Sequence, residues 1–326
     1  KIYYPIDLRS CVRRALATIR PKAVILVEAE IWPNFLWGIQ ARKIPHFIVN
    51  TRISINSYKR YHRFGFIFRS LFGGFTGVGA QSYDDAKKLF ELGCDKNVVQ
   101  VFGSCKFDGL DIKREYRVDI SSLLKNLGVN DKTLIIVAGS THHGEEEILI
   151  RLFKRLQKKY LNIFLILVPR HQERGKEVGE ILTEQEVNFV FRNQVSDNIA
   201  PMPFGSLDCL LVNTTGELKS FYEKATLVFV GKSLTARGGQ SPVEPAAFAK
   251  PIIFGPHMAN FAEITAKFLS NDAAIQVADE TELQEAFELL ITDESKRNAM
   301  GKAAQQVVQE NKGATEQTIS MILKGI

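Results

Sequence analysis

Short apolar runs alternate with stretches of helical periodicity along this chain, a pattern typical of parallel α/β architecture. The pattern predicts two successive series of strands. The first has strands at 23–28, 45–50, 76–80 and 97–102, with helices near 33–42, 57–71 and 83–92. The second has strands at 133–138, 163–168, 209–213, 227–230, 251–254 and 274–277, with a helix from about 144 to 159.

A polar and charged stretch, 108–129, separates the two series and holds one short helical piece at 120–127. After Val277 the pattern is purely helical, at 280–291, 294–310 and 314–323. We therefore predict two Rossmann-like parallel-sheet domains, residues 1–112 and 113–326, with the C-terminal helices in the second. Ligands bind such sheets at the carboxyl ends of the strands, so the residues after each strand are the candidate site residues.

Composition narrows the class of protein. At 326 residues the chain exceeds what one core usually organises, and no apolar run approaches the ~18 residues of a membrane span. Four cysteines without C-x-x-C spacing are typical of reduced, buried thiols in a cytosolic protein. The net charge of +6 and the pI near 9.0 favour an anionic partner: a nucleotide, a nucleic acid or an acidic membrane surface.

Two carboxylates follow the first apolar run. Glu28 and Glu30 come after residues 23–27 and before Trp32-Pro33, where the backbone turns into a helix. At the end of a parallel strand these side chains face the site rather than the core. A cap or a salt bridge explains Glu28 better than it explains Glu30. Lys106 follows the last strand of the first series and is expected to face the same site.

The second series begins with a glycine turn and a helix start. Ser140 and Thr141 suit a helix cap and, equally, a seat for an anion, and acidic residues follow them at 145–147. His142 and His143 are adjacent, so they do not share a helix face, and no third ligand lies near them in the sequence. We therefore expect no metal site.

Two further strand ends carry charge. Pro169-Arg170-His171 follows 163–168, and the guanidinium fork of Arg170 suits a phosphate or a carboxylate, although a surface salt bridge is the alternative. Gly216-Glu217-Leu218 follows 209–213, where a glycine permits close approach and a carboxylate can accept hydrogen bonds from ribose hydroxyls. A plain helix start explains this second motif equally well.

The densest signal is Gly238-Gly239-Gln240-Ser241-Pro242-Val243-Glu244. A hydroxyl at the cap, a proline after it and a glutamate three residues after the cap form a capping box, which presents backbone N–H groups to a phosphate. It is not a dinucleotide fingerprint, because the G-x-G-x-x-G spacing is absent.

The segment 57–72 mixes basic residues with aromatic ones. Such a segment can lie on an anionic membrane, and a partly buried helix with snorkelling cations explains it equally well.

Taken together, these segments resemble the Kdo transferases, bacterial glycosyltransferases that attach 3-deoxy-D-manno-octulosonic acid (Kdo) from CMP-Kdo to the lipid A precursor. The motifs that carry the resemblance run in family order over nearly the whole chain. They are Tyr4-Pro-Ile-Asp7, Val27-Glu-Ala-Glu-Ile-Trp-Pro-Asn34, Asn50-Thr-Arg-Ile-Ser54, Gly103-Ser-Cys-Lys-Phe-Asp108, Ser140-Thr-His142 with Glu145-Glu146, Pro169-Arg-His171, Gly216-Glu-Leu218, Gly238-Gly-Gln-Ser-Pro-Val-Glu-Pro245 and Gly255-Pro-His257 with Asn260-Phe261.

The resemblance implies a GT-B fold, two Rossmann-like domains around a cleft, and inverting transfer without a metal or a cofactor. It implies that Glu30 and Lys106 steady the transition state. It assigns CMP to Pro169, Arg170, Gly216, Glu217, Leu218, Ser241, Pro242, Val243 and Glu244. Further candidates are Glu28, Ser140, His171, Gly239 and Gln240. The partners it implies are CMP-Kdo, the lipid A precursor and the cytoplasmic face of the bacterial inner membrane, and no nucleic acid.

The chain departs from the family pattern in two places. Gly238-Gly-Gln-Ser241 stands where the family usually has Gly-Gly-His-Asn. The family's general base is a glutamate in a Gly-Glu motif upstream of a Tyr-Tyr-Pro segment, which here is Tyr3-Tyr4-Pro5. We therefore expect the chain to be an N-terminally truncated piece that binds CMP-Kdo but transfers little. The alternatives are another GT-B enzyme, such as a UDP-sugar transferase or epimerase, and an inactive nucleotide-binding scaffold.

Overall fold

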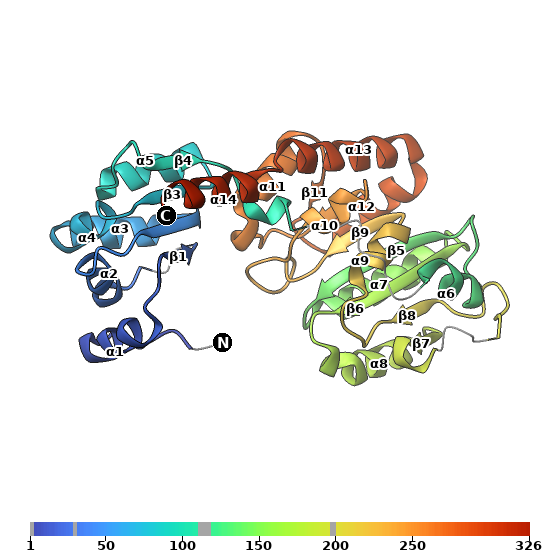
Figure 1. Ribbon diagram of the computed structural model, residues 1–326. Helices are drawn as coiled ribbons and strands as arrows, with labels where there is room; N and C mark the ends of the chain where they lie inside the picture. The colour runs from blue at the N-terminus through green and yellow to red at the C-terminus, as the bar shows by residue number, and fades with distance from the viewer. Residues whose placement is uncertain (1–2, 29–30, 110–118, 196–199) are drawn as a thin grey trace. The chain divides into compact units, whose positions relative to one another are not determined.

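The computed structural model describes residues 3–28, 31–109, 119–195 and 200–326. The chain forms two compact units, Lys1–Gly109 with Asn311–Ile326, and Leu110–Glu310, called here the first and the second unit. Each is built on its own parallel sheet (Figure 1).

The first unit contains a four-stranded parallel sheet in the order β1-β2-β3-β4. Its strands are β1 (Val24–Val27), β2 (His46–Thr51), β3 (Gly77–Ala80) and β4 (Val99–Val101), and they lie within or close to the predicted runs. Its helices are α1 (Arg9–Ile19), α2 (Pro33–Gln40), α3 (Ile55–Arg63), α4 (Gly65–Phe72), α5 (Tyr83–Leu92), the short η1 (Cys105–Phe107) and α14 (Ala314–Lys324). The single helix expected near 57–71 is two helices, because the backbone leaves the helical conformation at Phe64.

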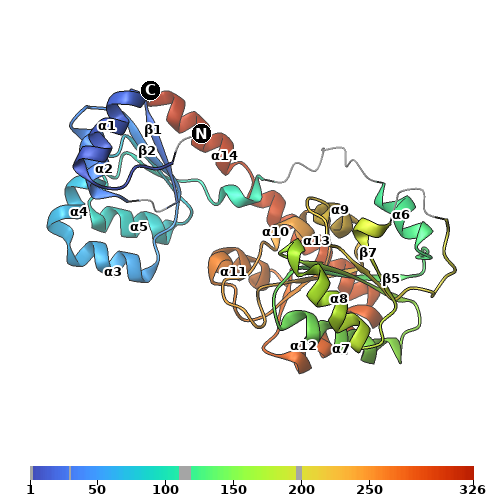
Figure 2. The same ribbon diagram turned by 90° about the horizontal axis from the view of Figure 1, so that it is seen from below.

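Alternation along β2 explains how both faces of this sheet are covered. Ile48 belongs to the larger core with α1, α2, α4 and α5, whereas Phe47 and Val49 point to the opposite face and pack against Met321 of α14. Figure 2 shows α1 and α2 on one side of the sheet and α14 on the other.

The packing of α14 differs from the expectation that all three C-terminal helices belong to the second domain. Besides Met321, a capping interaction holds this helix. The carboxylate of Asp108 accepts hydrogen bonds from the backbone N–H of Gly313, at 2.7 Å, and of Thr315, at 2.6 Å. A carboxylate at a helix N-terminus satisfies otherwise unpaired donors. This contact joins residues about two hundred positions apart, so no local pattern in the sequence reveals it.

The second unit has a seven-stranded parallel sheet in the order β11-β10-β9-β5-β6-β8-β7. The strands are β5 (Leu134–Thr141), β6 (Ile163–Pro169), β7 (Phe189–Phe191), β8 (Cys209–Leu211), β9 (Leu227–Val230), β10 (Ile252–Phe254) and β11 (Ile275–Gln276). The helices are α6 (Ile120–Asn126), α7 (Glu145–Gln157), α8 (Gly175–Glu184), α9 (Leu218–Lys224), α10 (Val243–Ala247), α11 (Ala262–Ser270), α12 (Glu280–Thr292) and α13 (Glu294–Glu310), with short turns η2 (Gln172–Arg174), η3 (Arg192–Gln194) and η4 (Ala259–Phe261). Strand β7 and helix α11 were not predicted from the sequence, and α8 and α9 were expected only as helix starts, without a range.

The order of these strands marks where a ligand site belongs. From β5 the chain moves outward through β6 on one side, and β9 returns to pair with β5 on the other side. In open α/β sheets the crevice at such a switch point, at the carboxyl ends of the strands, is where ligands bind. Strands β5, β6 and β9 are almost wholly buried, so the side chains able to meet a ligand are those just beyond their ends.

Candidate functional site

The ends of β5 and β9 carry residues in an unusual backbone conformation. Ser140, the second-to-last residue of β5, has φ of 56°, and Lys232, just after β9, has φ of 57°. A left-handed backbone costs a residue other than glycine about 1–2 kcal/mol. Such strained positions cluster at functional sites, where the surrounding structure holds them in place. The strain therefore coincides with the switch point of the sheet.

A pocket of about 280 Å³ opens at these strand ends in the second unit. It is lined by Ser140, Arg170, Gly216, Leu218, Lys219, Tyr222, Gln240, Ser241 and Glu244. Seven of these nine were predicted from the sequence, and they come from four segments that lie apart in the chain. The structure thus brings together side chains up to about one hundred positions apart.

Two lining residues, Lys219 and Tyr222, were not predicted from the sequence. Both lie on α9, three positions apart and so on one face of its first turns. Assigning a helix to 218–224 would have placed them beside Leu218. Tyr222 is almost fully buried, and burial raises the pKa of its phenol.

Three charged groups set the electrostatics of the pocket. The Lys219 ammonium lies 3.7 Å from a carboxylate oxygen of Glu244, and each side chain is about one-third exposed. Burial raises the pKa of Glu244, and the positive charges of Lys219 and Arg170 oppose that shift. Two cations therefore share the pocket with one carboxylate, which leaves a net positive charge suited to an anionic ligand.

Glu145, the first residue of α7, holds together two backbone segments close to the pocket. Its fully buried carboxylate accepts four backbone hydrogen bonds. One oxygen accepts from His142, at 2.9 Å, and Lys232, at 2.7 Å; the other accepts from Ser233, at 2.8 Å, and Leu234, at 2.9 Å. One side chain thereby fixes the loop after β9 against the end of β5.

The capping box expected at Ser241–Glu244 forms only in part. Helix α10 begins at Val243, one residue later than expected, and the Ser241 hydroxyl accepts from the Val243 N–H at 3.4 Å. Pro242 and Val243 are buried beneath the pocket and do not line it. The carboxylate of Glu244 pairs with Lys219 instead of turning back to the cap, so it faces the pocket.

Glycines shape the same loop. Gly238 and Gly239 have φ of 118° and 75°, and a Cβ on Gly239 would lie 2.4 Å from the Met258 sulfur. These positions therefore require glycine for both conformation and space. Of the remaining candidates, Pro169 is buried at the end of β6, and His171 lies against His142 with ring centroids 5.8 Å apart.

Glu217 differs from the expectation of a ribose contact. Its carboxylate accepts hydrogen bonds from the Arg192 guanidinium, at 2.9 and 3.1 Å, and from the Thr214 hydroxyl. Arg192 is buried and also donates to the Val195 carbonyl at 2.8 Å. Glu217 thus holds the 214–218 turn in place, while its neighbours Gly216 and Leu218 line the pocket.

We expect Arg192→Met to lower the free energy of unfolding of the second unit by about 2 kcal/mol. Removing one partner of a fully buried ion pair costs about 3–5 kcal/mol. The expected loss is smaller here because Glu217 is 16% exposed and keeps the Thr214 hydroxyl. Urea denaturation measures it, with Arg155→Met, whose side chain is half exposed, as the control. Equal stability of the two variants would contradict a structural role for Arg192.

The strand ends of the first unit bring together another set of candidates. The Lys106 ammonium lies 3.7 Å from a Glu28 carboxylate oxygen, which pairs two predicted residues. Glu28 has φ of 67°, and Asn50, at the end of β2, has φ of 51°. The Asn50 side chain accepts from the Cys105 N–H at 3.1 Å and so orients η1, which carries Lys106. Glu30 lies outside the described residues.

Asn50 was not predicted as a site residue from the sequence. Its signal was available, since asparagine is one of the few residues that tolerate a left-handed backbone at a strand end. Within the described ranges, no group of three or more His, Cys, Asp or Glu side chains comes together as a metal site would require. No helix in the part of the chain that the structure describes has the length and apolar character needed to cross a bilayer.

Comparison with known proteins assigns the chain to a family. Residues 1–109 match the family described as 3-deoxy-D-manno-octulosonic-acid transferase (kdotransferase), and residues 208–307 match the one described as glycosyl transferases group 1. The chain is 32% identical to the 3-deoxy-D-manno-octulosonic acid transferase of Haemophilus influenzae, over 98% of this chain and 73% of that protein. It is 30% identical to the enzyme of the same name from Bordetella pertussis, with the same coverage.

Solved structures show the same fold. The C-terminal CMP-Kdo binding domain of WaaA from Acinetobacter baumannii has a TM-score of 0.53 and 24% identity, covering 58% of this chain and 95% of that one. The UDP-GlcNAc 2-epimerase from Neisseria meningitidis bound to UDP-GlcNAc has a TM-score of 0.60 and 15% identity, covering 97% and 80%. The chain therefore belongs to the Kdo transferase family and is a glycosyltransferase with the GT-B fold.

Proposed function

We propose that the chain transfers Kdo from CMP-Kdo to a lipid A precursor in lipopolysaccharide biosynthesis, and that the pocket of the second unit holds CMP. The observation that carries the proposal is the pocket itself, where Arg170, Lys219, Ser241 and Glu244 converge at a sheet switch point. The Acinetobacter baumannii domain that shares this fold is described as CMP-Kdo binding, which supports the choice of nucleotide.

The charges of the pocket suit the chemistry. In the proposed reaction the bond from the anomeric carbon of Kdo to the phosphate oxygen breaks, and CMP leaves with the electron pair. The acceptor hydroxyl forms the new bond on the opposite face and gives its proton to a general base, so the configuration inverts. Arg170 and Lys219 offset the charge that develops on the phosphate, a task that requires positive charge in place before the reaction. In this proposal no metal is needed.

Roles in the first unit follow from its strand ends. We assign Lys106 to the carboxylate of Kdo, which lies beside the reacting carbon, and Glu30 to the oxocarbenium-like transition state. Glu28 positions Lys106 through their ion pair. Asn50 orients η1 through Cys105, so it supports the same lysine.

Titration with nucleotides tests the proposed function. We expect CMP to bind more tightly than UDP, because the pocket is assigned to cytosine with a single phosphate. We expect the affinity for CDP to be little higher than that for CMP, for the same reason. Isothermal calorimetry with the three nucleotides measures both differences. Tighter binding of UDP would instead favour the UDP-sugar enzymes whose fold the whole chain shares. Binding of CMP without transfer under any condition would favour a scaffold.

Transfer itself is measured with two proteins. The resemblance places the general base upstream of Tyr3-Tyr4-Pro5, so this chain is compared with a chimera that carries the N-terminal segment of a Kdo transferase relative before Tyr3. We expect both proteins to bind CMP-Kdo, and we expect the turnover of the chimera to be much higher than that of this chain. Substantial turnover by this chain alone would assign the base to a residue within it.

We further propose that α3 and α4 touch the cytoplasmic face of the inner membrane. Phe66 is 82% exposed and Phe64 is 43% exposed, while Tyr61 and Leu71 are buried. The helices are thus anchored in the core and present aromatic side chains beside the exposed Lys59, Arg60 and Arg63. Substituting these three cations by serine is expected to weaken binding to anionic liposomes in a flotation assay, and unchanged binding would count against the contact.

A further inference from the structure

The positive charge of this chain is concentrated at one end. Residues 1–83 contain thirteen lysines and arginines and three acidic residues, whereas residues 84–326 contain twenty-nine basic and thirty-three acidic residues. The net charge of +6 thus arises entirely within the first unit. Such asymmetry indicates an anionic partner for that unit, beyond the nucleotide assigned to the second.

Part of this charge surrounds a pocket between α1 and α2. The pocket encloses about 270 Å³ and is lined by Arg9, Val12, Arg13, Asn34, Trp37, Gly38 and Arg42. Gly38 lets the two helices close over its floor, because a Cβ there would lie 2.9 Å from Val12 and 3.1 Å from Leu16. Val12 and Leu16 are buried, so the floor is apolar and the arginines form the rim.

The three arginines lack the partners that surface arginines often find. In the ranges that the structure describes, Arg9, Arg13 and Arg42 form no ion pair, and Arg42 donates only to the Gly38 carbonyl, at 3.0 Å. Asp7, the acidic residue nearest to Arg9 and Arg13 in sequence, is occupied at the start of α2, where it accepts hydrogen bonds from the backbone N–H groups of Asn34 and Phe35. The rim therefore remains positively charged.

The position of Arg9 adds a second observation. Arg9 is the first residue of α1, and no acidic residue lies in the first turn of this helix. A cation at a helix N-terminus opposes the helix dipole and costs about 0.3–1 kcal/mol. Arg13 lies one helical turn further along the same face. Arg9 thus lowers the stability of α1 at the place where both arginines can serve a bound anion.

An exposed aromatic side chain lines the same pocket. Trp37 is 37% exposed, and the chain just before Arg9 carries two more exposed apolar residues, Ile6 at 73% and Leu8 at 57%. Tryptophan and arginine together are typical of the level of lipid headgroups, where one end of a ligand is charged and the other is apolar. A free phosphate ion would make no use of the aliphatic residues. A nucleic acid backbone would need a longer basic surface than a pocket of this volume provides.

We propose that the α1–α2 pocket binds the phosphate headgroup of an acidic membrane lipid. Arg9, Arg13 and Arg42 hold the phosphate oxygens, and Trp37, Ile6 and Leu8 contact the glycerol and the upper acyl region. This site is separate from the CMP pocket and from the α3–α4 contact. Its failure would leave the proposed transferase activity untouched.

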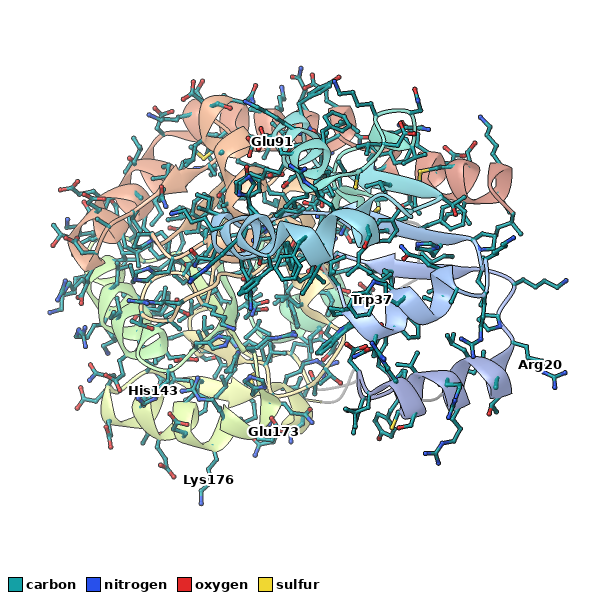
Figure 3. All side chains as sticks on the ribbon, turned by 90° about the vertical axis from the view of Figure 1, so that its left-hand side faces the viewer. Arg20, Trp37, Glu91, His143, Glu173 and Lys176 are labelled. Atoms are coloured by element: carbon teal, nitrogen blue, oxygen red, sulfur yellow. The ribbon has the colours of Figure 1, made fainter. Side chains whose placement is uncertain are left out.

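The two tryptophans of the chain make a specific test. They are Trp32 and Trp37, so Trp32→Phe leaves the pocket residue as the sole indole reporter. We expect its emission to shift to shorter wavelength on mixing with phosphatidylcholine vesicles that contain phosphatidic acid, and to stay unchanged with pure phosphatidylcholine. On this background, Arg9→Gln/Arg13→Gln/Arg42→Gln is compared with the matched triple Arg14→Gln/Arg20→Gln/Lys22→Gln. Figure 3 shows Arg20 extending away from the end of α1.

The two triples remove the same charge, which separates a built site from general attraction. Each basic residue near an anionic surface contributes about 1 kcal/mol without any specific contact, so non-specific attraction predicts equal losses. We expect the pocket triple to lose at least about tenfold more affinity than the control, which corresponds to about 1.4 kcal/mol. Equal losses would overturn the proposal. A full response to soluble glycerol 3-phosphate without vesicles would overturn the lipid assignment.

A single variant guards against misfolding of the triple. Arg42→Lys keeps the charge, so we expect it to fold. It loses the planar guanidinium fork that can hold a phosphate through two hydrogen bonds, so we expect it to bind acidic vesicles several-fold more weakly. Wild-type binding by Arg42→Lys would contradict the proposed site.

Discussion

Replacing Glu145 by alanine is expected to lower the free energy of unfolding of the second unit by about 4 kcal/mol. The buried carboxylate accepts backbone hydrogen bonds from His142, Lys232, Ser233 and Leu234. A buried donor without an acceptor costs about 1–3 kcal/mol. The substitution leaves four such donors without their acceptor at once, although water that enters the cavity recovers part of that cost. In a unit of this size the melting temperature should fall by about 10 °C.

Glu145→Gln separates the two parts of this effect. Glutamine keeps the volume and one acceptor oxygen, so we expect about half of the loss. Glu147→Ala is the control, because Glu147 lies in the same first turn of α7 and is exposed. Chemical denaturation monitored by circular dichroism compares the three. A Glu145→Ala variant within about 1 kcal/mol of Glu147→Ala would show that the four hydrogen bonds do not frame the loop.

Loss of Glu145 should also affect the pocket, because Glu145 fixes the loop after β9. Ser233 also donates from its hydroxyl to the Val230 carbonyl, at 2.6 Å, and accepts from the Gly255 N–H, at 2.8 Å. The same loop bonds onward to the glycine turn, where the Gly239 N–H donates to the Lys232 carbonyl at 2.9 Å. Loss of Glu145 should therefore weaken nucleotide binding even though Glu145 itself does not line the pocket.

The role of Glu145 also shows what a sequence can and cannot predict. Three acidic residues at the start of α7 predict a helix N-terminus, and the helix begins there. The hydrogen bonds to Lys232, Ser233 and Leu234 span almost ninety positions, and no local periodicity encodes them. The same reason explains the position of α14 and the capture of Glu217 by Arg192.

What the sequence predicts well is the edge where the site lies. Parallel strands end at a common edge, so a run of buried residues followed by a polar one locates a lining residue without knowledge of the topology. Ser140 and Arg170 were found in this way. Lys219 and Tyr222 were missed because they lie on a helix that follows a loop, where the strand-end rule gives no guidance.

Arg170→Ala is expected to lower the affinity for CMP by about a hundredfold. A charge-assisted hydrogen bond contributes about 1.5–3 kcal/mol, and a guanidinium that holds a phosphate through two such bonds lies at the upper end. Arg170→Lys keeps the charge without the fork and should retain part of the affinity. Lys219→Met should cost less, about tenfold, because Lys219 is also paired with Glu244. Lys176→Ala is the control, since Figure 3 shows Lys176 extending away from its helix.

Cytidine distinguishes a phosphate contact from damage to the pocket. If Arg170 binds the phosphate, Arg170→Ala should lower the affinity for CMP while binding of cytidine stays within about threefold of wild type. A variant that weakens both ligands equally would show that Arg170 only supports the fold of the strand end. The two cations share one phosphate, so the losses in the Arg170→Ala/Lys219→Met double variant should not add. Full additivity would place Lys219 on a different part of the ligand, for which the carboxylate of Kdo is the natural candidate.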